Sequence, residues 1–206
     1  MSIPLVLYGE HVDLRPLSLA DAALTCRWRN CDRAAFLSQG ATEPAEQAKW
    51  IAARPASELN FIVELKTGRP VGMLSLVNLD LIHRRAEPGR FLIGEPAAVR
   101  GIPVALEAMK LLYGLAFDGL GLLRIWGTIA ADNVRMIKLQ KYLGMREEGR
   151  MRQHYLVNNG TLQDAILLGL LVEEYRQLTL PRLEALIESC RPATSTTPTK
   201  AEALTC

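Results

Sequence analysis

A glycine-containing loop between an apolar segment and a long amphipathic segment has residue types that could bind a phosphate. The run Phe91-Leu92-Ile93-Gly94 has strand character and leads through Arg100-Gly101 to a helix expected from about Pro103. At such a helix start, backbone N–H groups and the helix dipole attract an anion, and small residues let it approach. The sequence therefore indicates a phosphate-binding loop. An ordinary strand–helix connection is the alternative, and the loop alone does not separate the two.

Basic side chains offer a second anion-binding chemistry. Arg29, Arg84 and Arg85 could contact a diphosphate through bidentate hydrogen bonds. A solvated hairpin tip accounts for Arg84 and Arg85 equally well. The four cysteines and three histidines are scattered without metal-ligand spacing, so the sequence predicts no metal site.

The elements that must position these residues follow one another as β-α-α-β-β-β-α-β-α-β-β. Hydrophobic periodicity and turn residues predict strands at 11–16, 61–65, 71–79, 86–93, 123–129, 148–157 and 161–171. Helices are predicted at 18–30, 44–54, 103–118, 133–143 and 173–190, the last with a kink or break at Pro181. This order describes an α/β fold with one mixed sheet and helices on its faces.

Length and composition bound the class of protein. The chain has 206 residues, of which 49% are hydrophobic, enough for one domain, expected at 1–191. Residues 192–206 are rich in Thr, Ser and Pro and are expected to form a disordered tail. A net charge of +2 argues against nucleic acid as the main partner. No apolar run reaches membrane-spanning length and no signal peptide is recognisable, so we expect no membrane contact and a cytoplasmic location.

Several segments, in this order, resemble the GNAT superfamily of acetyl-CoA-dependent N-acyltransferases. Residues 100–105, Arg-Gly-x-x-x-Ala, are similar to its pyrophosphate loop, and residues 133–145 to the motif in which an Asn opens the next cofactor helix. Residues 14–16, 28–30 and 147–164 look like the branch that contains ribosomal-protein and spermidine acetyltransferases. The resemblance covers residues 8 to 175.

The resemblance implies a largely antiparallel sheet that splays open to form a cleft for acetyl-CoA, the cosubstrate, with no metal. It also implies that a backbone N–H in the Ile93–Gly94 region polarises the thioester carbonyl. The residues it assigns to cofactor binding are Leu92, Ile93, Gly94, Arg100, Gly101, Ile102, Val104, Ala105, Asn133 and Lys138.

The sequence departs from the family pattern at two positions. Pro103 stands where the second loop glycine is usual and has no N–H to give, although proline is suited to the first position of a helix. Gln140 stands where many relatives have the tyrosine that protonates the leaving thiolate. Tyr142 lies about 200° further around that helix and is expected to face elsewhere, so the general acid is left open.

Within the resemblance, Glu87 is the preferred general base, because an amine is protonated near neutral pH and must lose a proton before it attacks. A surface ion pair of Glu87 with Arg84 or Arg85 is an equal alternative. Glu95 is a weaker candidate for the base.

For the acceptor, the resemblance favours a small-molecule amine, in particular a nucleotide-linked amino sugar. The residues assigned to it are Arg29, Asn30, Asn78, Asp80 and Arg84. Alternatives are a polyamine, for which Asp80 and Glu87 are a sparse acidic pocket, and a protein N-terminus. A non-catalytic domain that senses acyl-CoA is a further alternative, and a homodimer is left open.

Overall fold

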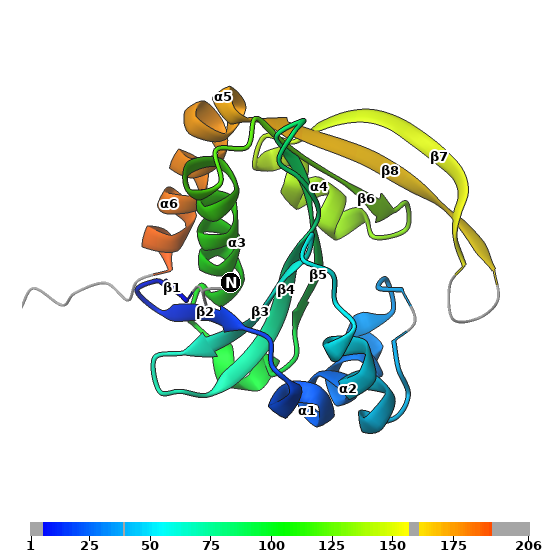
Figure 1. Ribbon diagram of the computed structural model, residues 1–206. Coiled ribbons are helices and arrows are strands. Elements are labelled where there is room, and N and C mark those ends of the chain that lie inside the picture. The colour runs from blue at the N-terminus through cyan, green and yellow to red at the C-terminus, as the bar shows by residue number, and fades with distance from the viewer. Residues whose placement is uncertain (1–5, 39, 157–160, 191–206) are drawn as a thin grey trace, which may run out of the picture.

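The computed structural model describes residues 6–38, 40–156 and 161–190, which form one sheet with helices on both faces (Figure 1). The strands are β1 (Leu7–Tyr8), β2 (Val12–Pro16), β3 (Leu59–Leu65), β4 (Pro70–Asp80), β5 (Arg85–Ile93), β6 (Arg124–Ala130), β7 (Arg146–Leu156) and β8 (Leu162–Leu171). The helices are α1 (Ala22–Arg29), α2 (Pro44–Ala52), α3 (Val104–Gly114), α4 (Val134–Tyr142), α5 (Val172–Glu174) and α6 (Leu180–Ser189). The predicted elements occur in the predicted order, and β1 is an additional strand that the sequence did not predict.

The sheet is antiparallel except at one junction. Its strand order is β1-β2-β3-β4-β5-β6-β8-β7. The parallel pair β5–β6 is joined only at Arg85↔Arg124 and Ala86↔Ile125, whereas the flanking antiparallel pairs are extended ladders. The mixed, largely antiparallel sheet is therefore confirmed, and it is divided into two halves at β5–β6.

In the middle of the first half, consecutive side chains of β3 and β4 are buried, so both faces of the sheet are covered there. In β3, Phe61 and Val63 point into the main core with α3, while Ile62 points to a smaller cluster with Trp28 of α1. Figure 1 shows α3 and α6 on one side of this half and α1 and α2 on the other. Side chains that alternate along β5 therefore reach opposite faces of the sheet.

A buried carboxylate fixes the position of α3 against the first strands. Glu107 is 5% exposed and accepts hydrogen bonds from the backbone N–H groups of Glu10, His11 and Val12 at 2.6, 2.7 and 2.9 Å. These three charge-assisted bonds satisfy a carboxylate that would otherwise be costly to bury. They also hold the first turns of α3 in place.

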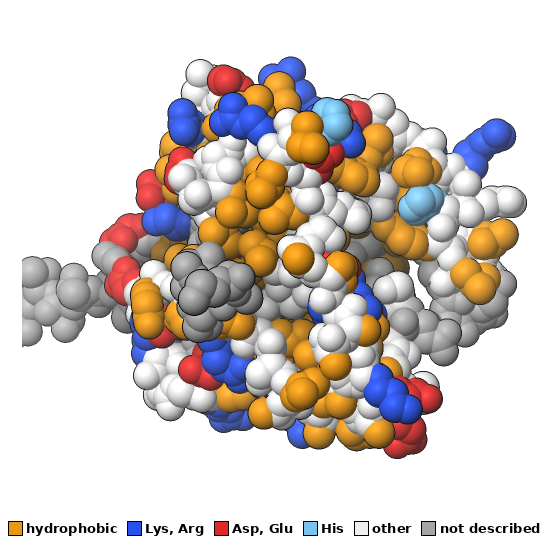
Figure 2. Space-filling view, viewed as in Figure 1, with side chains coloured by type: hydrophobic (Ala, Val, Ile, Leu, Met, Phe, Trp, Pro, Cys, Tyr) orange, Lys and Arg blue, Asp and Glu red, His pale blue; other side chains and the backbone are white. Residues whose placement is uncertain are grey.

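The second half ends in a long arm made of β7 and β8, which curves away from the body (Figure 1). Most β7 side chains are exposed. Figure 2 shows apolar side chains at the surface of this arm, where Met151, Leu156 and Leu162 are exposed.

Of the kink or break predicted at Pro181, the break does not occur. The helical segment from α5 to α6 continues through a π-helical turn at Tyr175–Thr179, and Pro181 lies in the first turn of α6. The wider turn just before the proline accommodates its missing N–H. Residues 158–160, which separate the last two predicted strands, and the predicted tail at 192–206 lie outside the described residues. No helix in the described part of the chain is long and apolar enough to cross a membrane.

Candidate functional site

The separation of β5 from β6 leaves an opening in the middle of the sheet. Beyond Ala86 and Ile125 the two strands no longer pair, so the edges that face each other have backbone groups outside the ladder. Gly94 N donates to Val71 O of the β4 side at 2.9 Å, so the preceding residue, Ile93, directs its backbone groups to the opening. An extended ligand arm could pair there as an added strand would.

The loop of residues 94–103 joins this edge to α3 and is built for backbone contacts. Gly101 is exposed and has φ +75°, a left-handed conformation that favours glycine. The first bond of α3 runs from Glu107 N to Pro103 O, which leaves the N–H groups of Ala105 and Leu106 for an outside acceptor. With exposed Arg100 nearby, these donors suit a phosphate.

The expected place of Pro103 needs correction. Pro103 is the N-cap of α3 with ψ 42°, and Val104 is the first helical residue. Because a proline at the N-cap has no N–H to offer, the donors of the loop begin after it. Val104 is 1% exposed, so only its backbone is available to a ligand.

Helix α1 and the turn after it are attached to the loop at the end of β5. A Cβ on Gly94 would lie 2.3 Å from carbon atoms of the Trp28 indole, so the absence of a side chain lets the ring pack on the strand. Trp28 Nε1 donates to Glu95 Oε1 at 3.0 Å, and Arg33 Nε donates to Ile93 O at 3.1 Å. These contacts hold α1 and the turn after it against the end of β5.

Glu87 lies where β5 and β6 begin to separate. Its Oε2 accepts from Asn78 Nδ2 of β4 at 2.8 Å, and its carboxylate also accepts the backbone N–H of Thr128 in β6. Burial raises the pKa of Glu87 although these two bonds and the neighbouring Arg90 and His154 lower it. A carboxylate with a raised pKa in an opening is suited to proton transfer near neutral pH.

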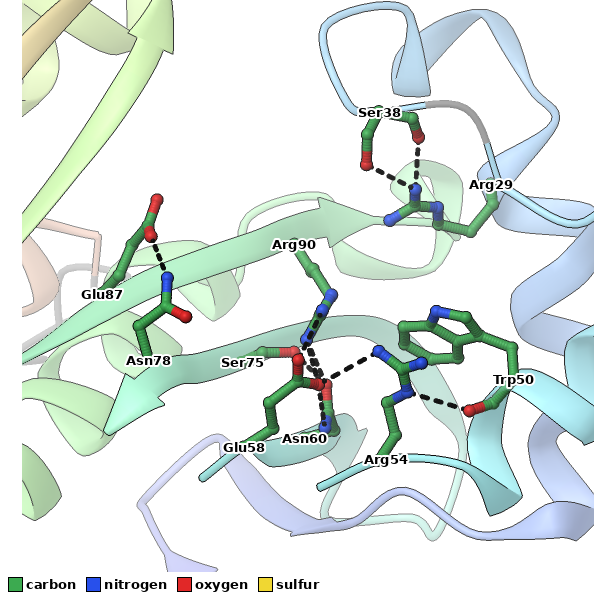
Figure 3. A network of polar contacts seen from close by, with 10 residues as sticks. All are labelled: Arg29, Ser38, Trp50, Arg54, Glu58, Asn60, Ser75, Asn78, Glu87 and Arg90. Atoms are coloured by element: carbon green, nitrogen blue, oxygen red, sulfur yellow. Dashed lines mark hydrogen bonds and ion pairs between the residues drawn. The ribbon is translucent and has the colours of Figure 1, made fainter. Parts of the chain in front are cut away.

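A pocket of about 110 Å³ lies on the α1–α2 side of β5. We call it the Arg29–Arg90 pocket; its lining is Arg29, Ser38, Gly40, Ala41, Gln47, Trp50, Met73 and Arg90. Arg29 donates to the backbone O of Ser38, and burial, together with the charge of Arg90, lowers the pKa of Arg29 (Figure 3). Two guanidinium groups that face one pocket favour an anionic ligand group.

Arg90 is held by a dense polar network. It donates to Glu58 at 2.8 Å and to Asn60 Oδ1 at 2.9 Å, and its guanidinium lies 5.0 Å from the centre of the Trp50 ring. Figure 3 shows the side chains of Glu58, Asn60 and Arg90 converging on one another. This network neutralises part of the charge and orients the guanidinium.

Backbone strain is concentrated around these groups. Among the described residues, four non-glycine residues have positive φ: Asn78, Arg84, Arg90 and Gln153, at 51° to 53°. Asn78, Arg90 and Gln153 each lie at a register shift in β4, β5 or β7. Such bulges redirect side chains and recur near functional sites. Here they direct Asn78 to Glu87 and Arg90 to the pocket network.

The structure brings some of the predicted residues together and separates others. Asn30 donates to Cys26 O and Ala41 O, each at 2.8 Å, and so positions the pocket loop. Asp80 pairs with His83 and Arg85 in the β4–β5 hairpin. Arg84 donates to Gly121 O at 2.8 Å. Asp80 and Arg84 are therefore occupied at the hairpin and do not line the pocket.

The structure also places the remaining predicted residues. Leu92 belongs to the cluster with Trp28, and Ile102 packs against the main core. Asn133 caps α4 by accepting from Met136 N at 3.3 Å, and Lys138 is exposed on that helix. Glu87 is not paired with Arg84 or Arg85 but with Asn78 and Thr128.

Helix α4 presents no phenol to the opening. Gln140 is 8% exposed and accepts from the buried Tyr113 hydroxyl at 3.1 Å. Tyr142 is 53% exposed and lies beside Arg182, so it faces elsewhere, as the helix geometry predicts.

Sequence reasoning missed Trp50, Glu58, Asn60, Arg90, Thr128 and Tyr155. They come from α2, from the start of β3, and from β5, β6 and β7, and no local motif marks them. The pair Pro88-Gly89 just before Arg90 was the available signal, since these residues disfavour a regular ladder.

Comparison with known proteins adds an independent finding. Residues 11–146 match the model of a family described as an acetyltransferase (GNAT) domain. Spermidine N(1)-acetyltransferase of Escherichia coli (strain K12) is 29% identical over 119 residues, 58% of this chain and 61% of that protein. The chain thus matches only about three fifths of the length of that relative.

Two further similarities extend over more of the chain. An uncharacterised N-acetyltransferase, p20, of Bacillus licheniformis is 28% identical over 178 residues, 82% of this chain and 97% of that protein. The crystal structure of a GCN5-related N-acetyltransferase from Brucella melitensis has a TM-score of 0.73 at 24% identity, covering 93% and 87% of the two chains. The latter is a likeness of fold.

Proposed function

The chain belongs to the GNAT acetyltransferase family, and on that premise we propose that it transfers an acetyl group from acetyl-CoA to the primary amine of a small molecule. The observation that carries the proposal is the opening between β5 and β6, bordered by a loop with free backbone donors and by a carboxylate with a raised pKa. Acetyl-CoA would supply the activated acyl group.

Residues on the loop side of β5 fit the cosubstrate. The N–H groups of Ala105 and Leu106 and the exposed side chain of Arg100 would hold the pyrophosphate at the start of α3. The open edge of β5 at Ile93 would pair with the pantetheine arm, once Arg33 releases the Ile93 carbonyl. Apart from the Arg100 side chain, these contacts use the backbone.

Residues on the other side fit the acceptor. Glu87 would take the first proton from the acceptor ammonium, because its raised pKa lies nearer to neutrality than that of an exposed glutamate. Arg29 and Arg90 favour an acceptor with an anionic group beside its amine. A nucleotide-linked amino sugar satisfies this requirement, although none of the relatives named above is described as acting on one.

Spermidine is the second candidate acceptor. Its support is the similarity to the spermidine acetyltransferase of Escherichia coli and the presence of Glu87 in the opening. Two arginines at the pocket oppose a polycation, because like charges repel. The geometry therefore favours the anionic acceptor.

The test has two stages. Millimolar CoA or acetyl-CoA should raise the melting temperature, because a ligand selective for the folded state stabilises it; an unchanged melting temperature would contradict the cosubstrate assignment. Thiol release should then be measured with spermidine, a nucleotide-linked amino sugar and a peptide N-terminus. Release with the anionic acceptor supports the proposal. Binding of CoA without release on any amine would favour a sensing domain.

A further inference from the structure

Only one phenol lies at the opening. The sequence has five tyrosines, all within the described residues: Tyr8, Tyr113, Tyr142, Tyr155 and Tyr175. Two are largely exposed (Tyr8 and Tyr142), and two are almost fully buried (Tyr113 and Tyr175). Tyr155, half-buried near the end of β7, extends past β8 to β6.

The hydroxyl of Tyr155 and the carboxylate of Glu87 meet at one residue. Tyr155 donates to Thr128 O at 3.1 Å, and the Thr128 hydroxyl lies 2.5 Å from the Tyr155 oxygen. The N–H of the same Thr128 bonds to Glu87. Because the N–H and C=O of one strand residue point to the same side, both groups lie in the gap between β5 and β6.

A bulge aims Tyr155 at this gap. Between Met151 and Tyr155 the register of β7 against β8 shifts by two residues, and Gln153 has φ +51°. Asp164 of β8 stabilises the bulge by accepting Gln153 N–H at 2.9 Å and Arg150 Nε at 2.7 Å. β-Bulges redirect side chains and recur next to active sites, so this bulge is consistent with a functional role for Tyr155.

We propose that Tyr155 is a catalytic acid of this site and that it works opposite Glu87; the inference rests on the proposed acetyl transfer. Glu87 takes one proton from the acceptor ammonium and releases it to solvent. The nitrogen lone pair forms the C–N bond, and the C–S bond breaks with its electron pair on sulfur. Tyr155 gives its proton to the thiolate, and the second proton of the nitrogen restores the Tyr155 hydroxyl. One proton is released and one ends on the thiol.

The electrostatics agree with these roles. Burial and the charge of Glu87 raise the pKa of Tyr155, although the bond from Thr128 opposes the rise, so the phenol holds its proton at neutral pH. Arg90 of β5 and His154 of β7 act on Glu87, and both lower its pKa. The bond from the Thr128 hydroxyl stabilises the phenolate when the proton leaves.

The kinetic test compares matched variants. Tyr155→Phe should lower kcat by roughly a hundredfold, as expected for removal of a positioned acid, with little change in the KM for acetyl-CoA. Tyr142→Phe, the same change at an exposed phenol, should leave kcat unaltered. Asp164→Ala should lower kcat by less than Tyr155→Phe does. In the double variant it should cause no further loss, since Asp164 acts through Tyr155. Full activity in Tyr155→Phe would overturn the proposal.

A spectroscopic titration tests the pairing without turnover. The difference in tyrosinate absorbance between the wild-type protein and Tyr155→Phe should appear above the ordinary tyrosine pKa. Glu87→Gln should move it to lower pH, because a negative charge has been removed. An unmoved titration would overturn the pairing. A wild-type protein that binds no CoA would instead contradict the proposed function, while the titration would still decide whether Glu87 and Tyr155 interact.

Discussion

The loop of residues 94–103 and the Arg29–Arg90 pocket both adjoin β5, but they are built in opposite ways. The loop is one continuous segment whose backbone N–H groups and left-handed Gly101 form the proposed binding surface. The pocket takes side chains from α1, α2, β4, β5 and an intervening loop. A surface made of backbone depends on local conformation and tolerates sequence change, whereas a surface made of converging side chains depends on the identity of each residue.

The largest expected effect is that of removing the Glu87 carboxylate, a side chain that no backbone group can replace. Glu87→Gln should lower kcat/KM by roughly a hundredfold or more. Activity that requires the Glu87 carboxylate is present above its raised pKa and lost as pH falls through it, so this acid limb should vanish in the variant. Measured pH profiles of kcat/KM check both points. The loss should shrink at high pH, where free amine no longer needs the base.

Glu95→Gln is the matched control for that prediction. Glu95 is bonded to Trp28 and Arg27 beside the loop, so it should affect CoA affinity rather than the acid limb. Should Glu95→Gln abolish the limb while Glu87→Gln preserves it, the base would belong to the loop side.

Gly94→Ala should show how far the loop depends on α1. A methyl group there would lie 2.3 Å from the Trp28 indole, so the ring or the strand must move. We expect a loss of about 1–3 kcal/mol in the free energy of unfolding, together with weaker CoA binding. Gly89→Ala on the same strand is the control, because its Cβ would have Val77 at 4.0 Å as a neighbour. Denaturant melts and CoA titrations of both variants check this, and equal losses would contradict it.

Arg29→Ala should raise the KM for an anionic acceptor about tenfold, because that acceptor loses a charge partner. The same change should lower the KM for spermidine, because a repulsion is removed. Arg84→Ala removes an arginine that is bonded to Gly121 O at the hairpin, so it should change neither KM. Equal effects of Arg29→Ala on both acceptors would remove the charge argument for the pocket.

The smallest effect is expected at Gly101. Gly101→Ala meets no atom within 4 Å, so its cost comes from the left-handed φ of +75° and should be about 1 kcal/mol. If the loop holds CoA through its backbone, affinity should fall by more than stability does. Calorimetric titration with CoA beside thermal melts separates the two, and an unchanged affinity would argue against a role for this backbone segment.

Prediction from sequence succeeded where neighbours in the chain are neighbours in space. The order of elements, the cap at Asn133 and the outward direction of Tyr142 follow from periodicity and capping over a few residues. The place of Pro103 was off by one position, within the usual uncertainty of helix ends. Of the kink or break predicted at Pro181, the break does not occur, because a widened turn precedes the proline and the helix continues.

The sequence by itself determined the family, the mixed sheet and the loop before α3, because these depend on local patterns and on the order of segments along the chain. Only the tertiary structure decided which charges share a pocket. It placed Arg90 beside Arg29, assigned Arg84 to a hairpin and brought Tyr155 to Glu87 from a strand more than sixty residues away. The physical reason is that strand register and bulges, which set side-chain direction, are fixed by pairing between distant segments, and no local pattern encodes that pairing.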